Sequence, residues 1–209
     1  MRKKTIVLYN GINVPQLLPK REVKADSPTK FLYLGRIVPW KGCHRLIDIF
    51  SKVKKNHSQG KWELSLIGDT SYWSAAYRTL LQEQMRSSRL ESDCFLLPHT
   101  DDPAGAMRVH DVFVNTSFQE PFGRSIAEAQ AEGLAVIAFD SGGIREIIEH
   151  EKTGILVPYG DEESFALAIE RIIENKEEAL LMGRRGHERM KKYFNRDIQI
   201  PKICDELLK

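Results

Sequence analysis

The stretch DVFVNTSFQEPFGRSIAE, residues 111–128, runs through a strand, a loop and the start of a helix in immediate succession. Residues 111–115 have the apolar pattern of a buried strand, and a helix pattern begins near Gly123. The loop between them carries Glu120, and Glu128 follows on the helix. In α/β proteins this junction binds anions, because free backbone N–H groups and the helix dipole point there. The stretch therefore predicts an α/β protein with a ligand site beside this loop.

The same alternation of strand and helix extends in both directions from this stretch. Apolar strand patterns occupy residues 31–34, 62–67, 94–97, 111–115, 134–139 and 154–157, and a helix pattern follows each of them. Strands that are nearly all apolar are typical of a parallel sheet covered on both faces. We therefore predict a Rossmann-like α/β fold, with a parallel sheet of about six strands and helices on both faces.

The domain organisation follows from the same patterns. Residues 1–29 contain three prolines and a turn signal at Asn10-Gly11, and we expect them to form a hinge or linker arm. Residues 30–194 are predicted to form the Rossmann-like domain, and residues 195–209 a C-terminal tail or helix. A chain of 209 residues suffices for one such domain and is marginal for two.

Composition excludes several classes of function. The net charge of +2 gives no reason to expect a nucleic-acid partner. No apolar run approaches the roughly 20 residues of a membrane span, and residues 1–8 lack the pattern of a secretory signal. The three cysteines form no CxxC pair, which favours a cytoplasmic protein with inert thiols. The basic run at residues 184–192 is most simply a solvated helix face, with peripheral contact to anionic lipid as a second interpretation.

The cationic candidates follow the first strand, where ligands of parallel sheets bind. Gly35 lets the chain turn, Arg36 can clamp a phosphate, and Lys41 lies at the start of the next helix. A cation at that position opposes the helix dipole unless an anion is bound there, although both cations could also be solvated surface residues. His99 follows the third strand and could line a nucleobase pocket, but a lone loop histidine is more often solvated.

The carboxylate candidates are Glu120 and Glu128. At about 1.5 Å per helical residue, they should lie on the order of 10 Å apart. That separation suits a ligand with hydroxyl groups at both ends and a diphosphate between them, as in a nucleotide-sugar. The alternatives are a dipole-stabilising carboxylate for Glu120 and a solvated helix residue for Glu128. The sequence contains no Asp-x-Asp clamp, H-E-x-x-H motif or P-loop. We therefore expect no metal, and no cofactor besides the nucleotide-sugar substrate.

Five segments resemble, in the same order, the C-terminal, donor-binding half of a family 4 (group 1) glycosyltransferase of the GT-B fold. They are Asn10–Asn13, Gly35-Arg36 with Lys41-Gly42, residues 120–128, Gly142-Gly143 with Glu146, and residues 153–157. The resemblance implies transfer of a sugar from a nucleotide-sugar with retained configuration, usually without a metal. Two residues depart from the family pattern: Thr70 and Pro98 stand where glycine is frequent, which leaves the nucleotide base open.

The resemblance also assigns roles to the candidates. Arg36 and Lys41 would hold the donor diphosphate and steady the departing nucleotide, while Glu120 would meet the sugar hydroxyls near the reacting carbon. The backbone at residues 122–124 (Phe122, Gly123 and Arg124) would bind phosphate and sugar oxygens, and Glu128 would take the ribose hydroxyls.

A member of this family needs two such domains and is roughly twice this long. We therefore expect an excised domain or one subunit of a split enzyme, which is inactive alone. Its acceptor, a glycan, a lipid or a small molecule, would be bound by the missing N-terminal domain. Two alternatives stay open: a non-catalytic nucleotide-sugar-binding module, and a nucleotide-sugar epimerase-like domain.

Overall fold

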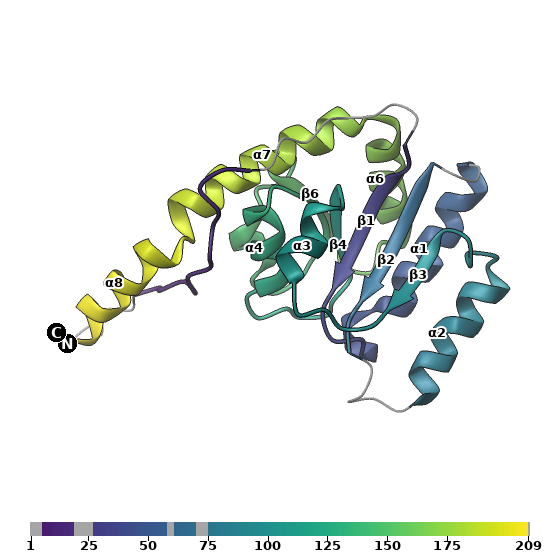
Figure 1. The fold of residues 1–209 in the computed structure, drawn as a ribbon, viewed down its shortest axis with the longest axis horizontal. Coiled ribbons are helices and arrows are strands. Elements are labelled where there is room, and N and C mark those ends of the chain that lie inside the picture. Colours follow the sequence, from purple (N-terminus) through teal and green to yellow (C-terminus); the bar gives the residue numbers. More distant parts are fainter. Residues whose placement is uncertain (1–5, 19–26, 58–60, 70–74, 209) are drawn as a thin grey trace.

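The computed structural model describes residues 6–18, 27–57, 61–69 and 75–208. Within this part of the chain lies a six-stranded sheet, in the order β3-β2-β1-β4-β5-β6, with every neighbouring pair parallel (Figure 1). The strands are β1 (Thr29–Leu34), β2 (Trp62–Ile67), β3 (Cys94–Leu97), β4 (Val112–Asn115), β5 (Ala135–Asp140) and β6 (Gly154–Pro158). The predicted parallel, Rossmann-like sheet is confirmed.

Helices cover both faces of the sheet. They are α1 (Cys43–Asn56), α2 (Ala75–Ser87), α3 (Pro103–Arg108), α4 (Arg124–Ala131), α5 (Ile144–Ile147), α6 (Glu162–Glu174), α7 (Lys176–Tyr193) and α8 (Arg196–Leu207), with a 3-10 turn, η1 (Pro39–Lys41). Alternate strand residues divide the apolar core into two clusters. Phe31 and Tyr33 of β1 pack with α1, α2 and α6, whereas Leu32 packs with α3, α4 and α5. Strand alternation thus supplies an apolar surface on each face.

The N-terminal segment is fastened to the junction between α7 and α8. Ile12 donates its N–H to the carbonyl of Phe194 and accepts from the N–H of Arg196, both at 2.9 Å. The Tyr9 ring lies 5.0 Å from that of Phe194. Figure 1 shows α8 extending away from the sheet, with this segment beside it and beside the end of α7. Two chain segments far apart in sequence therefore leave the domain together.

The C-terminal helix α8 occupies most of residues 195–209, the segment predicted to be a tail or a helix. It begins at Arg196, because the Asn195 side chain caps it by accepting from the N–H of Asp197, and it continues through Pro201. At the other end, Thr29 opens β1, one residue before the predicted start of the domain at residue 30. The domain boundaries themselves stay predictions.

Most of the basic run on α7 is exposed to solvent, as expected. Arg189 is the exception, because its guanidinium donates to the backbone carbonyls of Ile147 at 2.8 Å and Glu146 at 2.7 Å. This arginine ties α7 to α5. In the described part of the chain, none of the helices has the length and apolarity needed to cross a membrane.

Two of the three cysteines lie in the core. Cys43 and Cys94 are buried, and burial raises the pKa of each thiol to about 12. Both thiols therefore stay protonated at neutral pH, as the prediction of inert thiols requires. Cys204 on α8 is exposed. The cytoplasmic location stays a prediction.

Candidate functional site

The candidate site lies at the carboxyl ends of β1 and β4, which are neighbours in the sheet but not in sequence. Ligands of open α/β sheets bind in the crevice at such a reversal of strand order. The loops that follow the two strands are joined directly. Phe118 donates its N–H to the carbonyl of Trp40 at 3.1 Å, and the Thr116 hydroxyl donates to the carbonyl of Gly42 at 2.9 Å. The loop that carries the cations is therefore fixed to the loop that carries Glu120.

Lys41 and Glu120 form a hydrogen-bonded ion pair at this junction. Their side chains are only 13% and 12% exposed, so the two charges are shielded from water and depend on each other. The sequence predicted that Lys41 holds a diphosphate or is a solvated surface cation. The structure shows it paired with the candidate carboxylate. An ammonium group has three donors, so Lys41 retains the capacity to reach a second anion while it holds Glu120.

Arg36 lies beside this pair, and an indole ring connects them. Its guanidinium carbon is 5.3 Å from the centroid of the Trp40 ring, and the Lys41 Nζ is 4.4 Å from the same centroid. The structure therefore links Arg36, Trp40, Lys41 and Glu120 through consecutive contacts. The three residues predicted to be catalytic thus occupy one place.

Gly42 allows the close approach of the two loops. It has a φ of +77°, and a β-carbon there would lie 2.7 Å from the carbonyl oxygen of Thr116. We expect Gly42→Ala to lower the free energy of unfolding by about 2–3 kcal/mol, from backbone strain and this clash together. Urea denaturation of the variant and the wild type measures this difference in the free energy of unfolding.

Gly160 is the matched control for that substitution. Its φ is +87°, but a β-carbon on it would have no other atom within 4 Å. Gly160→Ala should therefore cost only the strain of a left-handed alanine, about 1 kcal/mol. Equal losses in the two variants would contradict the close approach at Gly42.

The loop before α4 is held from behind by the loop after β5. The carbonyl of Glu120 accepts the N–H of Gly143 at 2.9 Å, and a β-carbon on Gly142 would lie 2.2 Å from that carbonyl oxygen. Gln119, with a φ of +49°, donates its N–H to the Ser141 hydroxyl at 2.6 Å. Gly142 and Gly143 permit another group to approach their backbone closely. In this structure that group is the chain's own backbone at Glu120.

Among the described residues, three helices at this edge begin without a capping side chain. Gly42 precedes α1, Gly123 precedes α4 and Gly143 precedes α5. Side chains do cap α3, α6, α7 and α8, through Asp102, Asp161, Asn175 and Asn195. Two of the uncapped helices, α1 and α4, follow β1 and β4, so amide donors remain for an anion in the crevice.

The side chain of Phe122 points away from that anion position. It packs with the second apolar cluster, and its ring centroid is 6.2 Å from that of Phe194. Only the backbone of residues 122–124 is then available for the predicted contacts with phosphate and sugar oxygens. That role stays a prediction.

Gly35, Arg36 and His99 line one cavity of about 290 Å³ beyond β1, β2 and β3. The other lining residues are Leu34, Ile67, Gly68, Asp69 and Thr100. The His99 side chain is 68% exposed, with its Nε2 3.7 Å from the Asp101 carboxylate. The structure therefore places His99, the candidate for contact with the nucleobase, in the same cavity as Arg36, the candidate for contact with phosphate.

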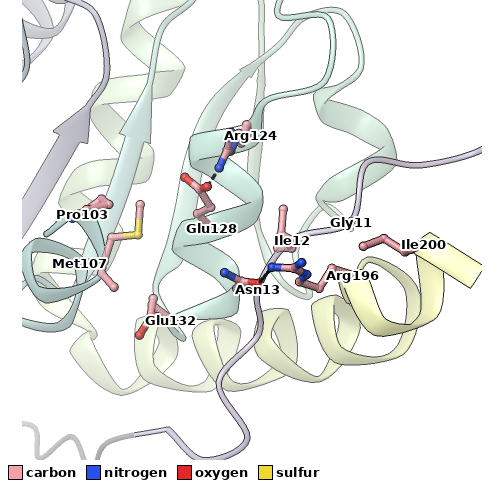
Figure 2. Close-up of a pocket in the computed structure, with 11 residues that line it drawn as sticks. Gly11, Ile12, Asn13, Pro103, Met107, Arg124, Glu128, Glu132, Arg196 and Ile200 are labelled. Carbon is pink, nitrogen blue, oxygen red and sulfur yellow. Dashed lines mark hydrogen bonds and ion pairs between the residues drawn. The ribbon is translucent and has the colours of Figure 1, made fainter. Parts of the chain in front are cut away.

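Glu128 lines a different cavity, of about 480 Å³ (Figure 2). Its carboxylate accepts from the Arg124 Nε at 2.8 Å. The cavity runs between α3, α4, the N-terminal segment and α8, and its lining includes Pro103, Met107, Ile12, Asn13 and Arg196. The candidate residues thus fall into two groups, because Arg36 and Glu128 line separate cavities.

Sequence reasoning missed several residues of the site. Trp40 is one, although an aromatic residue between two cations in RIVPWK was a usable signal. Tyr33 is another: its buried hydroxyl donates to the carbonyl of Arg36 at 2.7 Å, and burial raises the pKa of Tyr33 well above its usual value. Within an apolar strand it could not be distinguished from a core residue. Asn13 and Arg196, joined at 3.1 Å, come from opposite ends of the chain.

No cluster of His, Cys, Asp or Glu in the described residues has the arrangement to hold a metal ion. The side chains gathered at β1 and β4 offer charge and hydrogen bonding. Two cations, helix amides and a carboxylate suit a ligand that carries a diphosphate and hydroxyl groups.

Comparison with known proteins identifies the family. A model described as "Glycosyl transferases group 1" matches residues 16–189. The lipopolysaccharide core biosynthesis glycosyltransferase LpsE of Rhizobium meliloti is 29% identical over 178 residues, which cover 85% of this chain and 49% of LpsE. A GDP-mannose-dependent alpha-mannosyltransferase of Mycobacterium tuberculosis is 28% identical, over 95% of this chain and 48% of the relative.

Solved structures agree with the sequence matches. The crystal structure of Anabaena HepE in complex with UDP-glucose superposes with a TM-score of 0.79 at 28% identity, over 88% of this chain and 49% of HepE. The chain thus spans about half the length of the relatives it matches. It belongs to the group 1 glycosyl transferases, and its sheet is one Rossmann-like half of the GT-B fold.

Proposed function

We propose that this chain binds the nucleotide-sugar donor of a glycosyltransferase and transfers the sugar with retention of configuration, without a metal, once an acceptor domain is present. The observation that carries the proposal is the contact of Lys41 with Glu120 beside Arg36. Two cations that can bind a diphosphate and a carboxylate that can bind a sugar lie together near the uncapped start of α4.

The roles follow from charge. Arg36 and Lys41 stabilise the negative charge that develops on the departing nucleoside diphosphate, and the free amides of α4 add to this effect. Glu120, paired with Lys41, accepts hydrogen bonds from the sugar and stabilises positive charge on the oxocarbenium-like carbon. Because the protein acts on charges that form in the transition state, these contacts raise the rate rather than only the affinity.

The nucleoside end of the donor is assigned to Glu128 and to the His99 side of the sheet. Glu128 would accept from the ribose hydroxyls, and the loop at His99 would contact the base. HepE was solved with UDP-glucose, and the mycobacterial relative is GDP-mannose-dependent. These relatives support a nucleotide-sugar as the donor class and leave the base and the sugar open.

The acceptor would be bound by a second Rossmann-like domain. Relatives about twice as long as this chain support that partner, and its acceptor would be a glycan, a lipid or a small molecule. If the acceptor is a lipid, the exposed basic residues on α7 offer a face for anionic membranes. The family match favours a transferase over an epimerase-like domain or a non-catalytic binding module.

Isothermal titration calorimetry tests the donor assignment. We expect the 209-residue chain to bind at least one of UDP, GDP and ADP, with a Kd of about 1 μM to 1 mM, and to bind a matching nucleotide-sugar. Arg36→Ala should raise that Kd about tenfold, because a charge-assisted contact with phosphate is lost. Absence of binding to every nucleotide by the folded chain would overturn the proposal.

The metal and the acceptor domain are tested separately. EDTA should leave the affinity for the nucleotide-sugar unchanged, and a loss of more than about tenfold would contradict metal independence. We expect negligible sugar transfer by this chain alone, because one wall of the cleft is missing. With a second domain supplied, NMR of the product should show the anomeric configuration of the donor.

A further inference from the structure

The indole ring of Trp40 contacts both candidate phosphate cations. The Arg36 guanidinium carbon and the Lys41 Nζ lie 5.3 Å and 4.4 Å from the centre of the same ring. Both distances are within the roughly 6 Å over which the ring quadrupole attracts a cation. Trp40 is 40% exposed, so its ring is not placed there merely to fill the core.

The backbone on either side of this ring is fixed independently of it. The Tyr33 hydroxyl holds the carbonyl of Arg36 at 2.7 Å, and the N–H of Ile37 donates to the carbonyl of Asp69 at 3.1 Å. The turn that carries Trp40 is bonded to Phe118, at 3.1 Å. Removal of the ring would therefore leave the loop in place and change chiefly the directions of the two cationic side chains.

Two neighbouring cations repel each other when no anion lies between them. Lys41 is held by Glu120, but Arg36 is exposed and has a long side chain with many rotamers. A cation–π contact limits these rotamers and directs the guanidinium toward the side of the crevice where Lys41 lies. The ring thereby reduces the entropy that is lost when a diphosphate orders the two cations.

We propose that Trp40 is a positioning residue, whose indole ring keeps Arg36 and Lys41 together for the diphosphate of the donor. The inference rests on the proposed function, since it concerns the same ligand. It adds a residue that acts through the cations rather than by touching the reacting atoms.

The test is calorimetry of Trp40→Leu, Trp40→Phe and the wild-type chain with UDP, GDP and ADP. Trp40→Leu should raise the Kd of the nucleotide that binds about fivefold, and Trp40→Phe, which keeps a π-face, should remain within about twofold. The thermal midpoint should change little in both variants, because the loop is held by its backbone contacts. A Trp40→Leu variant with wild-type affinity would overturn the inference.

A double variant distinguishes positioning from a general effect on the fold. If Trp40 acts through Arg36, then Trp40→Leu should change the Kd less in an Arg36→Ala background than in the wild type. Full additivity of the two losses would contradict the inference. If the folded wild-type chain binds none of the three nucleotides, the proposed function itself fails, and that result is distinct from a failure of the inference about Trp40.

Tyr193 provides a matched control. Its ring contacts Arg189 and Lys192, at 5.5 Å and 5.0 Å from the ring centroid, and it is 44% exposed. Tyr193→Leu removes an equivalent pair of contacts at the end of α7 and should leave nucleotide binding unchanged. If Tyr193→Leu weakened binding as much as Trp40→Leu, the effect would not be specific to the site and the inference would fail.

Discussion

Lys41→Met is expected to lower the free energy of unfolding by about 3 kcal/mol at pH 7. The substitution leaves the Glu120 carboxylate, which is only 12% exposed, without the charge that compensates its burial. Removing one partner of a buried pair costs more than removing both, because an unpaired charge stays behind. Urea denaturation followed by circular dichroism measures the loss.

A double-mutant cycle shows whether the pair itself is responsible. Glu120→Gln should also destabilise the chain, and the combined variant should lie within about 1 kcal/mol of wild type, since no charge then remains buried. Simple addition of the two losses would contradict the pairing.

Lys52→Met is the surface control for this cycle. Lys52 pairs with Glu163 at 2.7 Å, but the side chains are 33% and 78% exposed. Solvent screens such a pair, so its loss should cost no more than about 1 kcal/mol. If Lys52→Met lowered the free energy of unfolding as much as Lys41→Met, the burial of Lys41 and Glu120 would not explain how much their pair stabilises the fold.

The sheet could be predicted from sequence because its information is local. The patterns at residues 62–67 and 94–97 match β2 and β3 residue for residue, since apolar runs between helix patterns define buried parallel strands. For residues 195–209 the choice between a tail and a helix was left open, because the apolar pattern there is weak and the helix start depends on capping by the Asn195 side chain.

The position of the site could also be predicted, but its contacts could not. Parallel topology places the residues after β1 and β4 at one edge, and Arg36, Lys41 and Glu120 are found there. The pairing of Lys41 with Glu120 depends on side-chain directions that no spacing rule contains. Likewise, a glycine such as Gly142 permits another group to approach the backbone closely. Only the structure shows that this group is the backbone of Glu120.

The two cavities also depend on contacts that could not be predicted from the sequence. Asn13 and Arg196 lie near Glu128 because the N-terminal segment pairs with the junction of α7 and α8. Sequence separation hides such a contact, since no local pattern links residues at opposite ends of a chain. The partition of the candidate residues between two cavities therefore emerged only from the structure, and it raises the question of which carboxylate serves which end of the donor.

Glu128→Ala and Glu120→Ala are expected to differ in their effects on the free nucleotide and the nucleotide-sugar. If Glu128 takes the ribose hydroxyls, its truncation should raise the Kd of the free nucleoside diphosphate about 10–100-fold, because hydrogen bonds to a charged group are lost. The nucleotide-sugar contains the same ribose and should lose the same factor.

Glu120→Ala should act mainly on the nucleotide-sugar. A free nucleoside diphosphate has no sugar for Glu120 to contact, and the substitution releases Lys41 from its ion pair. The released ammonium can turn fully to the diphosphate, so the Kd of the free nucleotide should stay the same or fall. The nucleotide-sugar loses its hydrogen bonds to the carboxylate, and its Kd should therefore rise about tenfold relative to that of the free nucleotide.

Glu132→Ala is the control for these two variants. Glu132 lines the same cavity as Glu128 and pairs with Arg108 at 3.0 Å. We propose no contact between Glu132 and either ligand. Calorimetry of the three variants with the free nucleotide and its sugar-linked form compares all the affinities directly, and Glu132→Ala should match wild type for both ligands. If Glu120→Ala weakened both ligands equally, as Glu128→Ala is expected to do, the division of the site into a sugar end and a ribose end would be contradicted, because a single shared effect on the fold would then account for both carboxylates.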